Sequence, residues 1–179
     1  IYRQFDKPKS FDANMVVIGA GSAGLVTSYI AAATKAKVIL IEKHLMGGDC
    51  LNTGCVPSKA LIRSAKMMSY YHRASEFGLS VKDITVDFPA VMERIQRVIS
   101  AIEPHDSVER YTQLGVDCSE GTANILDPYR VEVNGTIITT QNIVIGTGAR
   151  PSVPNIDGID TVSFYTSDTI WDLRKKPNK

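Results

Sequence analysis

The sequence predicts an α/β fold, in which a parallel sheet packs against helices and carries a small antiparallel β insert. Two observations support this prediction. Residues 15–42 have the pattern of a strand, a helix and a second strand, which is the βαβ unit of a parallel sheet. Residues 116–139 contain several short strand patterns, and the Asn134-Gly135 pair between two of them is a strong signal for a hairpin turn.

The βαβ unit comes first in the chain. Residues 15–19 (MVVIG) are apolar and rich in β-branched side chains, as expected of a strand that is buried on both faces. The segment 23–33 is rich in alanine and contains no proline, which favours a helix. Residues 37–42 (KVILIE) repeat the pattern of a buried strand.

Helices are predicted in the middle of the chain. The glycine-bearing segment 46–54 is expected to be a loop, and a helix is expected from about 57 to 76, because a first helical turn tolerates the proline at its start. Apolar side chains recur at helical spacing within 86–102. Residues 104–114 predict a further helix, which ends at Gly115.

The chain then returns to short strands. We expect them at 116–118, 122–126, 130–133, 136–139 and 143–145. The last of them, Ile143-Val-Ile145, is entirely apolar and is expected to be buried.

Composition and charge narrow the class of protein. The chain has 179 residues, of which 44% are hydrophobic, and this suits a globular domain rather than a disordered segment. Twenty basic and 19 acidic residues give a net charge of +1, which does not favour a nucleic acid or an anionic membrane as partner. No apolar run approaches the roughly 20 residues that span a bilayer. Residues 1–14 lack the apolar core of a signal peptide, so we expect a cytoplasmic protein.

Residues 19–24 (GAGSAG) have the G-x-G-x-x-G pattern of a dinucleotide-binding loop, and they lie between a predicted strand and a predicted helix. Gly19 allows a tight turn, Gly21 lets the backbone approach a pyrophosphate, and Gly24 lets helix and strand pack closely. The N–H groups at the helix N-terminus attract phosphate. Glu42, at the end of the second strand, can accept hydrogen bonds from ribose hydroxyls. The pattern does not distinguish FAD from NAD, and a glycine turn followed by an unrelated acid is the alternative.

Cys50 and Cys55 lie in the segment 47–59 (GGDCLNTGCVPSK), separated by four residues. A redox disulfide needs Cα atoms within about 7 Å of each other, which a glycine-bearing loop entering a helix can supply. The positive end of the helix dipole stabilises a thiolate. Lys59 lies one helical turn beyond Cys55 and is expected to point toward the same region.

A structural disulfide and a metal site are the alternatives for this cysteine pair. A zinc site would need two more ligands at suitable spacing, and the sequence offers none, so no metal site is predicted. Cys118 lies on a predicted strand and is expected to be a small buried apolar side chain. The three histidines, His44, His72 and His105, are expected at the surface.

The segment 47–59 resembles the redox motif of the class I pyridine nucleotide–disulfide oxidoreductases, which include lipoamide dehydrogenase, glutathione reductase and mercuric reductase. This resemblance implies a Rossmann-like FAD-binding domain and fixes the first nucleotide as FAD. It implies that Cys55 is the thiol beside the flavin and that Cys50 is the interchange thiol that meets the substrate. Lys59 would lie near the flavin N5.

The resemblance extends over nearly the whole chain. Gly121-Thr-Ala123 is similar to the segment that contacts the adenine side, and residues 143–151 resemble the family's A-T-G-x-x-P stretch. Asp49 departs from the usual Thr, and Gly146 replaces the usual Ala. The residues expected to bind FAD are Gly19, Gly21, Ser22, Ala23, Gly24, Glu42, Lys43, Gly48, Asp49, Cys50, Lys59, Gly121, Ala123, Thr147 and Gly148.

The resemblance also implies a domain organisation and a function. We expect an N-terminal extension (1–13), the FAD-binding domain (14–160) and a linker (161–179) toward an NAD(P)-binding domain that is not in the sequence. Electrons would pass from NAD(P)H through FAD to the Cys50–Cys55 disulfide, and on to a small-molecule disulfide or a thiophilic metal ion. The enzyme would be a homodimer similar to mercuric reductase. This chain alone is expected to be inactive and to bind FAD weakly or not at all.

Three other functions remain open at this point. The enzyme could be of the dihydrolipoamide dehydrogenase type. The chain could be a non-catalytic flavin- or nucleotide-binding module in which the cysteines form a structural disulfide. A flavin monooxygenase would share the glycine loop and the acid, but would not need Cys50 or Cys55.

Overall fold

The computed structural model describes residues 5–178, and the chain forms two compact units. The first, which we call the sheet unit, consists of the residues up to Cys50 together with Glu103–Ala149. The second, the hairpin unit, consists of Leu51–Ile102 and the residues from Arg150 onward. No helix in the part of the chain that the structure describes is long and apolar enough to cross a membrane.

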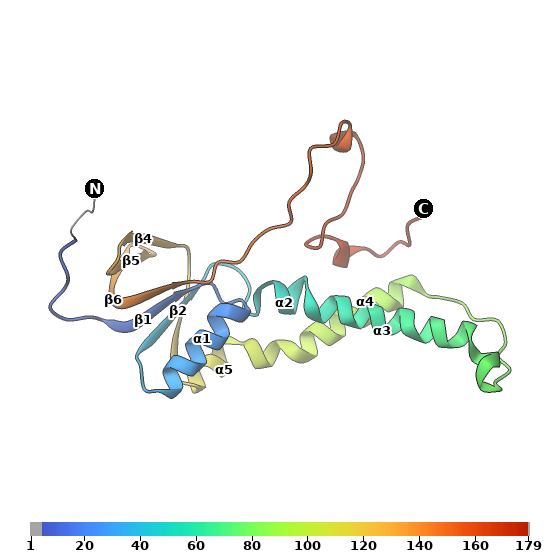
Figure 1. Cartoon of the computed structure of the whole chain (residues 1–179), viewed down its shortest axis with the longest axis horizontal. Helices are drawn as coiled ribbons and strands as arrows, with labels where there is room; N and C mark the ends of the chain where they lie inside the picture. Colours follow the sequence, from blue (N-terminus) through green and yellow to red (C-terminus); the bar gives the residue numbers. More distant parts are fainter. Residues whose placement is uncertain (1–4, 179) are drawn as a thin grey trace. The chain divides into compact units, whose positions relative to one another are not determined.

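The sheet unit is built on a six-stranded sheet with the order β3-β2-β1-β6-β5-β4 (Figure 1). β1 pairs in parallel with β2 and β6, and β2 pairs in parallel with β3. β5 is antiparallel to both β4 and β6, so the predicted class, a parallel sheet with a small antiparallel part, is confirmed. The strands are β1 (Ala13–Ile18), β2 (Val38–Glu42), β3 (Val116–Glu120), β4 (Ala123–Asp127), β5 (Arg130–Val133) and β6 (Thr136–Ile145).

β6 belongs to both parts of the sheet. Its first half, 136–139, pairs with β5, and its second half, 140–145, pairs with β1. The sequence predicted two separate strands because a polar triplet interrupts the apolar pattern, and this prediction was wrong. Thr140 is fully buried within one continuous strand, where its hydroxyl donates to the Asn142 carbonyl at 2.9 Å and its N–H donates to the Tyr129 carbonyl at 2.9 Å. The polar groups are therefore satisfied without a break in the strand.

Both faces of the parallel strands are covered. On one face, α1 (Ser22–Ala33) and α5 (Val108–Gln113) pack on the sheet; on the other, β5 packs against β1 and β2 (Figure 1). This arrangement explains why β1 and β2 are apolar throughout rather than alternating. The first core includes Val17, Leu25, Ala32, Leu40, Tyr111 and Val116, and the second includes Val16, Ile39, Ile41, Val131 and Val133.

The end of β6 differs from its prediction. Ile143 and Val144 are half-buried, and Ile145 is 67% exposed, so this apolar run is not the buried strand that its composition indicates. Ile145 is the last residue of the strand, and no described residue of the sheet unit packs over its side chain enough to bury it.

Two other segments also differ from their predictions. The expected loop 46–54 contains a short helix, α2 (Gly48–Asn52). The expected helix 104–114 is divided into a 3-10 turn (Glu103–Asp106) and α5. Ser107 separates them because its backbone is extended and its hydroxyl caps α5 by accepting the Arg110 N–H at 3.1 Å.

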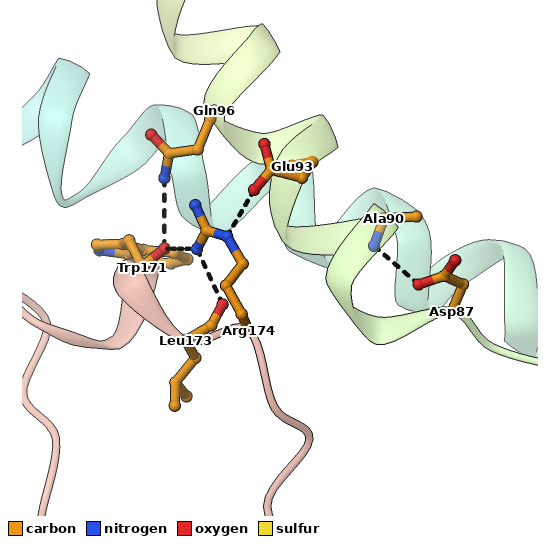
Figure 2. Close-up of polar contacts among 7 residues, drawn as sticks. All are labelled: Asp87, Ala90, Glu93, Gln96, Trp171, Leu173 and Arg174. Atoms are coloured by element: carbon orange, nitrogen blue, oxygen red, sulfur yellow. Dashed lines mark hydrogen bonds and ion pairs between the residues drawn. The ribbon is translucent and has the colours of Figure 1, made fainter.

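The hairpin unit consists mainly of two helices that run side by side, α3 (Cys55–His72) and α4 (Phe88–Ile102) (Figure 1). A 3-10 helix, η1 (Ala74–Phe77), follows α3, so the helix expected at 57–76 is present with shifted ends. Asp87 caps α4 by accepting the Ala90 N–H at 3.0 Å (Figure 2). The Arg94 guanidinium donates to the Ala60 carbonyl on α3 at 2.9 Å, which ties the two helices together.

The segment after the sheet unit also packs in the hairpin unit. It contains two short 3-10 helices, η3 (Ile159–Thr161) and η4 (Ile170–Asp172). Trp171 on η4 is 8% exposed and joins Ala60, Met92 and Ile95 in one apolar cluster. The role of 161–179 as a linker to another domain remains a prediction, but part of the segment has a fixed place against the helices.

Candidate nucleotide and thiol site

The glycine loop follows β1, and two of its glycines are required by the fold itself. Gly19 has a φ of +100°, and a Cβ on it would overlap with the backbone of Gly146. A Cβ on Gly24 would overlap with the carbonyl oxygen of Gly19, since α1 leaves the loop close to the strand. These two positions therefore have the roles that the sequence predicted, a tight turn and close helix–strand packing.

Gly21 is different, because neither its conformation nor its neighbours require glycine. Its φ is −79°, and a Cβ there would meet only Gly48 Cα, at the ordinary contact distance of 3.9 Å. Gly21 is also the N-cap of α1, and no side chain of the described residues caps the helix. The space beside Gly21 and the uncapped N–H groups of Ser22 and Ala23 thus suit a bound anion such as a pyrophosphate.

The end of the loop after β2, together with the first two residues of α2 (47–49), lies against the glycine loop. The Gly47 N–H donates to the Ala20 carbonyl at 2.9 Å. Gly48 has a φ of +54°, and a Cβ on it would lie 2.6 Å from Gly21 Cα, so glycine is required here as well. Asp49, which follows, is exposed.

A third loop, after β6, reaches the same edge of the sheet. The Gly146 N–H donates to the Ile18 carbonyl at 2.8 Å, and a Cβ on Gly146 would meet its nearest atoms at 3.4 Å, which leaves almost enough room for the alanine usual in the family. Thr147 and Gly148 are exposed, and a Cβ on Gly148 would lie 3.9 Å from the Asp49 carboxylate. Three loops therefore meet at the carboxyl end of β1, where parallel sheets bind ligands.

Glu42 ends β2 beside the glycine loop, and backbone N–H groups fix its carboxylate. One oxygen accepts the Ala20 N–H at 2.6 Å, and the other accepts those of Lys43 and His44, each at 2.8 Å. A carboxylate has about four acceptor positions, so a ribose hydroxyl could still be bound. The sequence predicted the ribose contact but not this structural role of Glu42.

Gly121 and Ala123 lie next to Glu42. The Gly121 N–H donates to the Glu42 carbonyl at 2.8 Å, and its φ of +150° favours glycine. The Asn134 side chain lies over Gly121 and donates to the Glu120 carbonyl at 2.8 Å. Ala123 is half-buried against the second core, so its contribution to a ligand site would come from its backbone.

The cysteines stand on two helices. Cys50 is on α2 and is half-buried. Cys55 is the first residue of α3, where the structure presents it as an exposed thiol. Its helix N-terminus has Gly54 as N-cap, and no side chain in the described part of the chain caps it. Lys59 is exposed one turn later, on the same side of α3 as Cys55, as predicted.

Sequence reasoning missed Trp171. Its indole N–H donates to the Thr53 carbonyl at 2.8 Å and to the Ser167 carbonyl at 2.7 Å. Thr53 lies between the two cysteines in the sequence, so a residue from the predicted linker contacts the backbone of the cysteine motif. The apolar residues at 170, 171 and 173, in an otherwise polar tail, were the available signal.

The three histidines have the expected places, and Cys118 is less buried than predicted. His44, His72 and His105 are exposed. Cys118 is half-buried against the first core, and burial, followed by the charge of Asp117, raises the pKa of its thiol. A raised pKa disfavours the thiolate, which agrees with an apolar packing role.

The amino-acid sequence of the chain is similar to a known protein family and to several enzymes. Residues 13–179 match the family described as pyridine nucleotide-disulphide oxidoreductase. A mercuric reductase from Bacillus cereus is 32% identical over 170 residues, which is 95% of this chain and 27% of that protein. A dihydrolipoyl dehydrogenase from Chlamydia pneumoniae is 39% identical over 169 residues, which is 92% of this chain and 36% of that protein.

A solved structure is also similar. The HOCl-induced flavoprotein disulfide reductase RclA from Escherichia coli matches with a TM-score of 0.73 and 27% sequence identity, over 90% of this chain and 34% of RclA. The fold is thus a Rossmann-like flavoprotein fold. The chain spans about a third of the length of the curated relatives it matches.

Proposed function

Because this chain belongs to the pyridine nucleotide-disulphide oxidoreductase family, we propose that it is the FAD-binding, thiol-bearing part of a flavin-dependent disulfide reductase. The main observation in support of a nucleotide site is the open space beside Gly21. Packing explains Gly19, Gly24 and Gly48, whereas a Cβ at position 21 would meet only Gly48 Cα, at 3.9 Å, which leaves space there for a ligand to approach the backbone. The family is FAD-dependent and uses NAD(P)H as donor, which agrees with this assignment.

The sheet unit would hold the adenosine and pyrophosphate parts of FAD. The first turn of α1, with Gly21, Ser22, Ala23 and Gly24, would bind the pyrophosphate through its N–H groups and its positive dipole. Glu42 would accept a ribose hydroxyl, and Lys43 would lie beside it. The backbone at 121–123 would border the adenine. Gly48, Asp49, Thr147 and Gly148 line the same edge and would face the rest of the cofactor.

Cys50 and Cys55 would carry out thiol–disulfide exchange. In the dithiol form, the Cys50 thiolate attacks one sulfur of a substrate disulfide and releases the first substrate thiol. The Cys55 thiolate then attacks the Cys50 sulfur and releases the second, which restores the Cys50–Cys55 disulfide. The substrate gains two electrons and two protons. When bound, FAD would supply two-electron redox chemistry, with NAD(P)H as the source of the electrons needed to reopen the disulfide. Lys59 would hold a positive charge near the flavin.

For the substrate, we propose a small disulfide or a thiophilic metal ion, as in a mercuric-reductase-like enzyme. Mercuric reductases are among the relatives at 30–33% identity. The dihydrolipoyl dehydrogenase at 39% identity supports a dihydrolipoamide dehydrogenase-type enzyme as the second candidate. We further propose a cytoplasmic homodimer, and weak or absent FAD binding by the isolated chain.

The test is an anaerobic dithionite titration of the complete protein that contains this chain. We expect uptake of four electrons per flavin, because the flavin and the disulfide each accept two, and a long-wavelength thiolate-to-flavin absorption at the two-electron stage. Cys55→Ser is expected to abolish this absorption, whereas the matched control Cys118→Ser is expected to retain it. Uptake of only two electrons without the absorption would contradict the proposal and favour a flavin module with structural cysteines.

A further inference from the structure

The connection between β3 and β4 joins the two outer strands of the sheet with only two residues. β3 ends at Glu120 and β4 begins at Ala123, although these strands stand at opposite ends of the sheet order. The antiparallel strands must therefore fold back over the parallel ones, which agrees with the packing of β5 against β1 and β2. The turn between β5 and β6, Asn134-Gly135, lies in consequence beside the end of β3.

The side chain of Asn134 binds the end of β3. Asn134 has a φ of +49°, a conformation that asparagine tolerates and that glycine adopts freely. Its carboxamide donates to the Glu120 carbonyl at 2.8 Å. A Cβ on Gly121 would lie 2.6 Å from Asn134 Oδ1 and 2.9 Å from its Nδ2, so the carboxamide lies directly over Gly121. The turn itself needs only a residue that accepts a positive φ, and it does not account for this contact.

Further hydrogen bonds connect this contact to the glycine loop. The Gly121 N–H donates to the Glu42 carbonyl at 2.8 Å, and the Glu42 carboxylate accepts the Ala20 N–H at 2.6 Å. All of these residues belong to the sheet unit. The side chain of Asn134 thus fixes the far end of a continuous series of contacts that ends at the glycine loop.

We infer that Asn134 is a positioning residue for the adenosine end of FAD, and that it acts through the backbone of residues 120–122. The inference rests on the proposed function, in which the backbone at 121–123 borders the adenine. A segment that is held in place before the ligand arrives loses less conformational freedom on binding. Removal of the Asn134 side chain therefore weakens binding of the adenosine half of the cofactor and spares the flavin half.

The test is Asn134→Gly in the complete protein that contains this chain, after removal of the flavin. Glycine accepts the same φ, so the turn is kept and the carboxamide is lost. Isothermal titration calorimetry gives the Kd of ADP, which is the adenosine and pyrophosphate part of FAD, and of riboflavin 5′-phosphate, which lacks the adenosine. We expect the Kd of ADP to rise about twofold to tenfold, as the loss of one net hydrogen bond implies, and that of riboflavin 5′-phosphate to stay unchanged.

Asn142→Ala is the matched control. Its side chain also donates to a backbone carbonyl in the same sheet, that of Asn14 at 3.1 Å, but at the opposite end of β1 from the glycine loop. We expect both Kd values to equal those of the wild type. If Asn134→Gly leaves the Kd of ADP unchanged, or if it weakens both ligands by the same factor, the inference fails and the proposed function stands. If the wild-type protein binds neither FAD nor ADP, both fail.

Hydrogen exchange of the same flavin-free proteins tests the positioning step without any ligand. The Gly121 N–H is bonded to the Glu42 carbonyl, so we expect Asn134→Gly to speed exchange in peptides that span residues 119–123. Peptides that span β1 should exchange as in the wild type. Unchanged exchange at 119–123 would overturn the inference even if the Kd of ADP rose, because the side chain would then not act through this backbone.

Discussion

The sheet unit and the hairpin unit hold their candidate site residues in different ways. In the sheet unit, the loops after β1, β2 and β6 are fixed by backbone contacts between glycines, such as those of Gly19 with Gly146 and of Gly48 with Gly21. In the hairpin unit, the backbone before Cys55 is bound by the side chain of Trp171, which lies 118 residues from Thr53 in the sequence. The first arrangement depends on residues that lack side chains, and the second on one large side chain.

This difference predicts where substitutions act. Adding atoms should damage the sheet unit, and removing atoms should damage the hairpin unit. The following experiments test the comparison, in order of decreasing expected effect.

Trp171→Ala is expected to have the largest effect, because truncating a buried tryptophan typically costs about 3–5 kcal/mol. The loss should be confined to the hairpin unit. Hydrogen exchange followed by mass spectrometry should show lost protection in α3 and α4, with β1 and β2 unchanged. Equal loss of protection in the strands would show that the two units do not respond separately, and the comparison would fail.

Gly24→Ala tests the opposite case in the sheet unit. The new Cβ would overlap with the Gly19 carbonyl oxygen, so we expect a loss of about 1–3 kcal/mol or more in the free energy of unfolding. Urea denaturation followed by circular dichroism measures it. Gly21→Ala is the matched control, since its Cβ has room, and it should cost at most about 1 kcal/mol. Similar losses for the two variants would remove the distinction between packing and ligand-binding glycines.

Ser28→Ala should stabilise the sheet unit. The Ser28 hydroxyl is fully buried on α1 and has no hydrogen-bond partner among the described residues. Alanine removes this polar group and favours the helix, so we expect a gain of about 1 kcal/mol. Thermal unfolding should show a higher midpoint. A lower midpoint would mean that the hydroxyl is bonded in solution.

Asp12→Asn is expected to have the smallest effect, which depends on pH. Hydrogen bonds from the Thr139 N–H and hydroxyl, at 2.9 and 2.7 Å, lower the pKa of the Asp12 carboxyl from its ordinary value of 3.8. Ionised Asp12 therefore stabilises the fold above that value, and the contribution is lost as the pH falls through the lower native pKa. Unfolding curves of the two proteins should differ near neutral pH and converge in acid. If the difference in stability between the two proteins persisted in acid, the stabilisation would not come from the ionised carboxylate of Asp12.

The contrast between local backbone contacts in the sheet unit and a long-range side-chain contact in the hairpin unit also explains how much could be predicted from the sequence. β1, α1, β2 and the glycine loop were predicted because buried parallel strands and glycine turns leave local patterns. Cys50, Cys55 and Lys59 were singled out by spacing. The continuity of β6 was missed because Thr140 can be buried only with its polar groups hydrogen-bonded, to the carbonyls of Tyr129 and Asn142. These hydrogen bonds leave no periodic pattern in the sequence. Helix α2 was missed because two glycines at its start suggest a loop.

The packing of Trp171 was missed for a related reason. A short 3-10 helix in a polar tail has no amphipathic repeat that would predict a buried face. The partner of the indole N–H is a main-chain carbonyl, and because every residue has one, the sequence does not mark Thr53 as the partner. Long-range contacts between a side chain and a backbone group therefore escape pattern analysis, whereas contacts within one βαβ unit do not.

Trp171 is the only tryptophan among the 179 residues. Fluorescence excited selectively in tryptophan therefore comes from a single indole, whose ring is buried and whose N–H is bonded to the carbonyl of Thr53. Release of the segment into water would shift this emission to longer wavelength. The chain thus carries a built-in optical reporter, through which docking of its tail can be followed in real time without any attached dye.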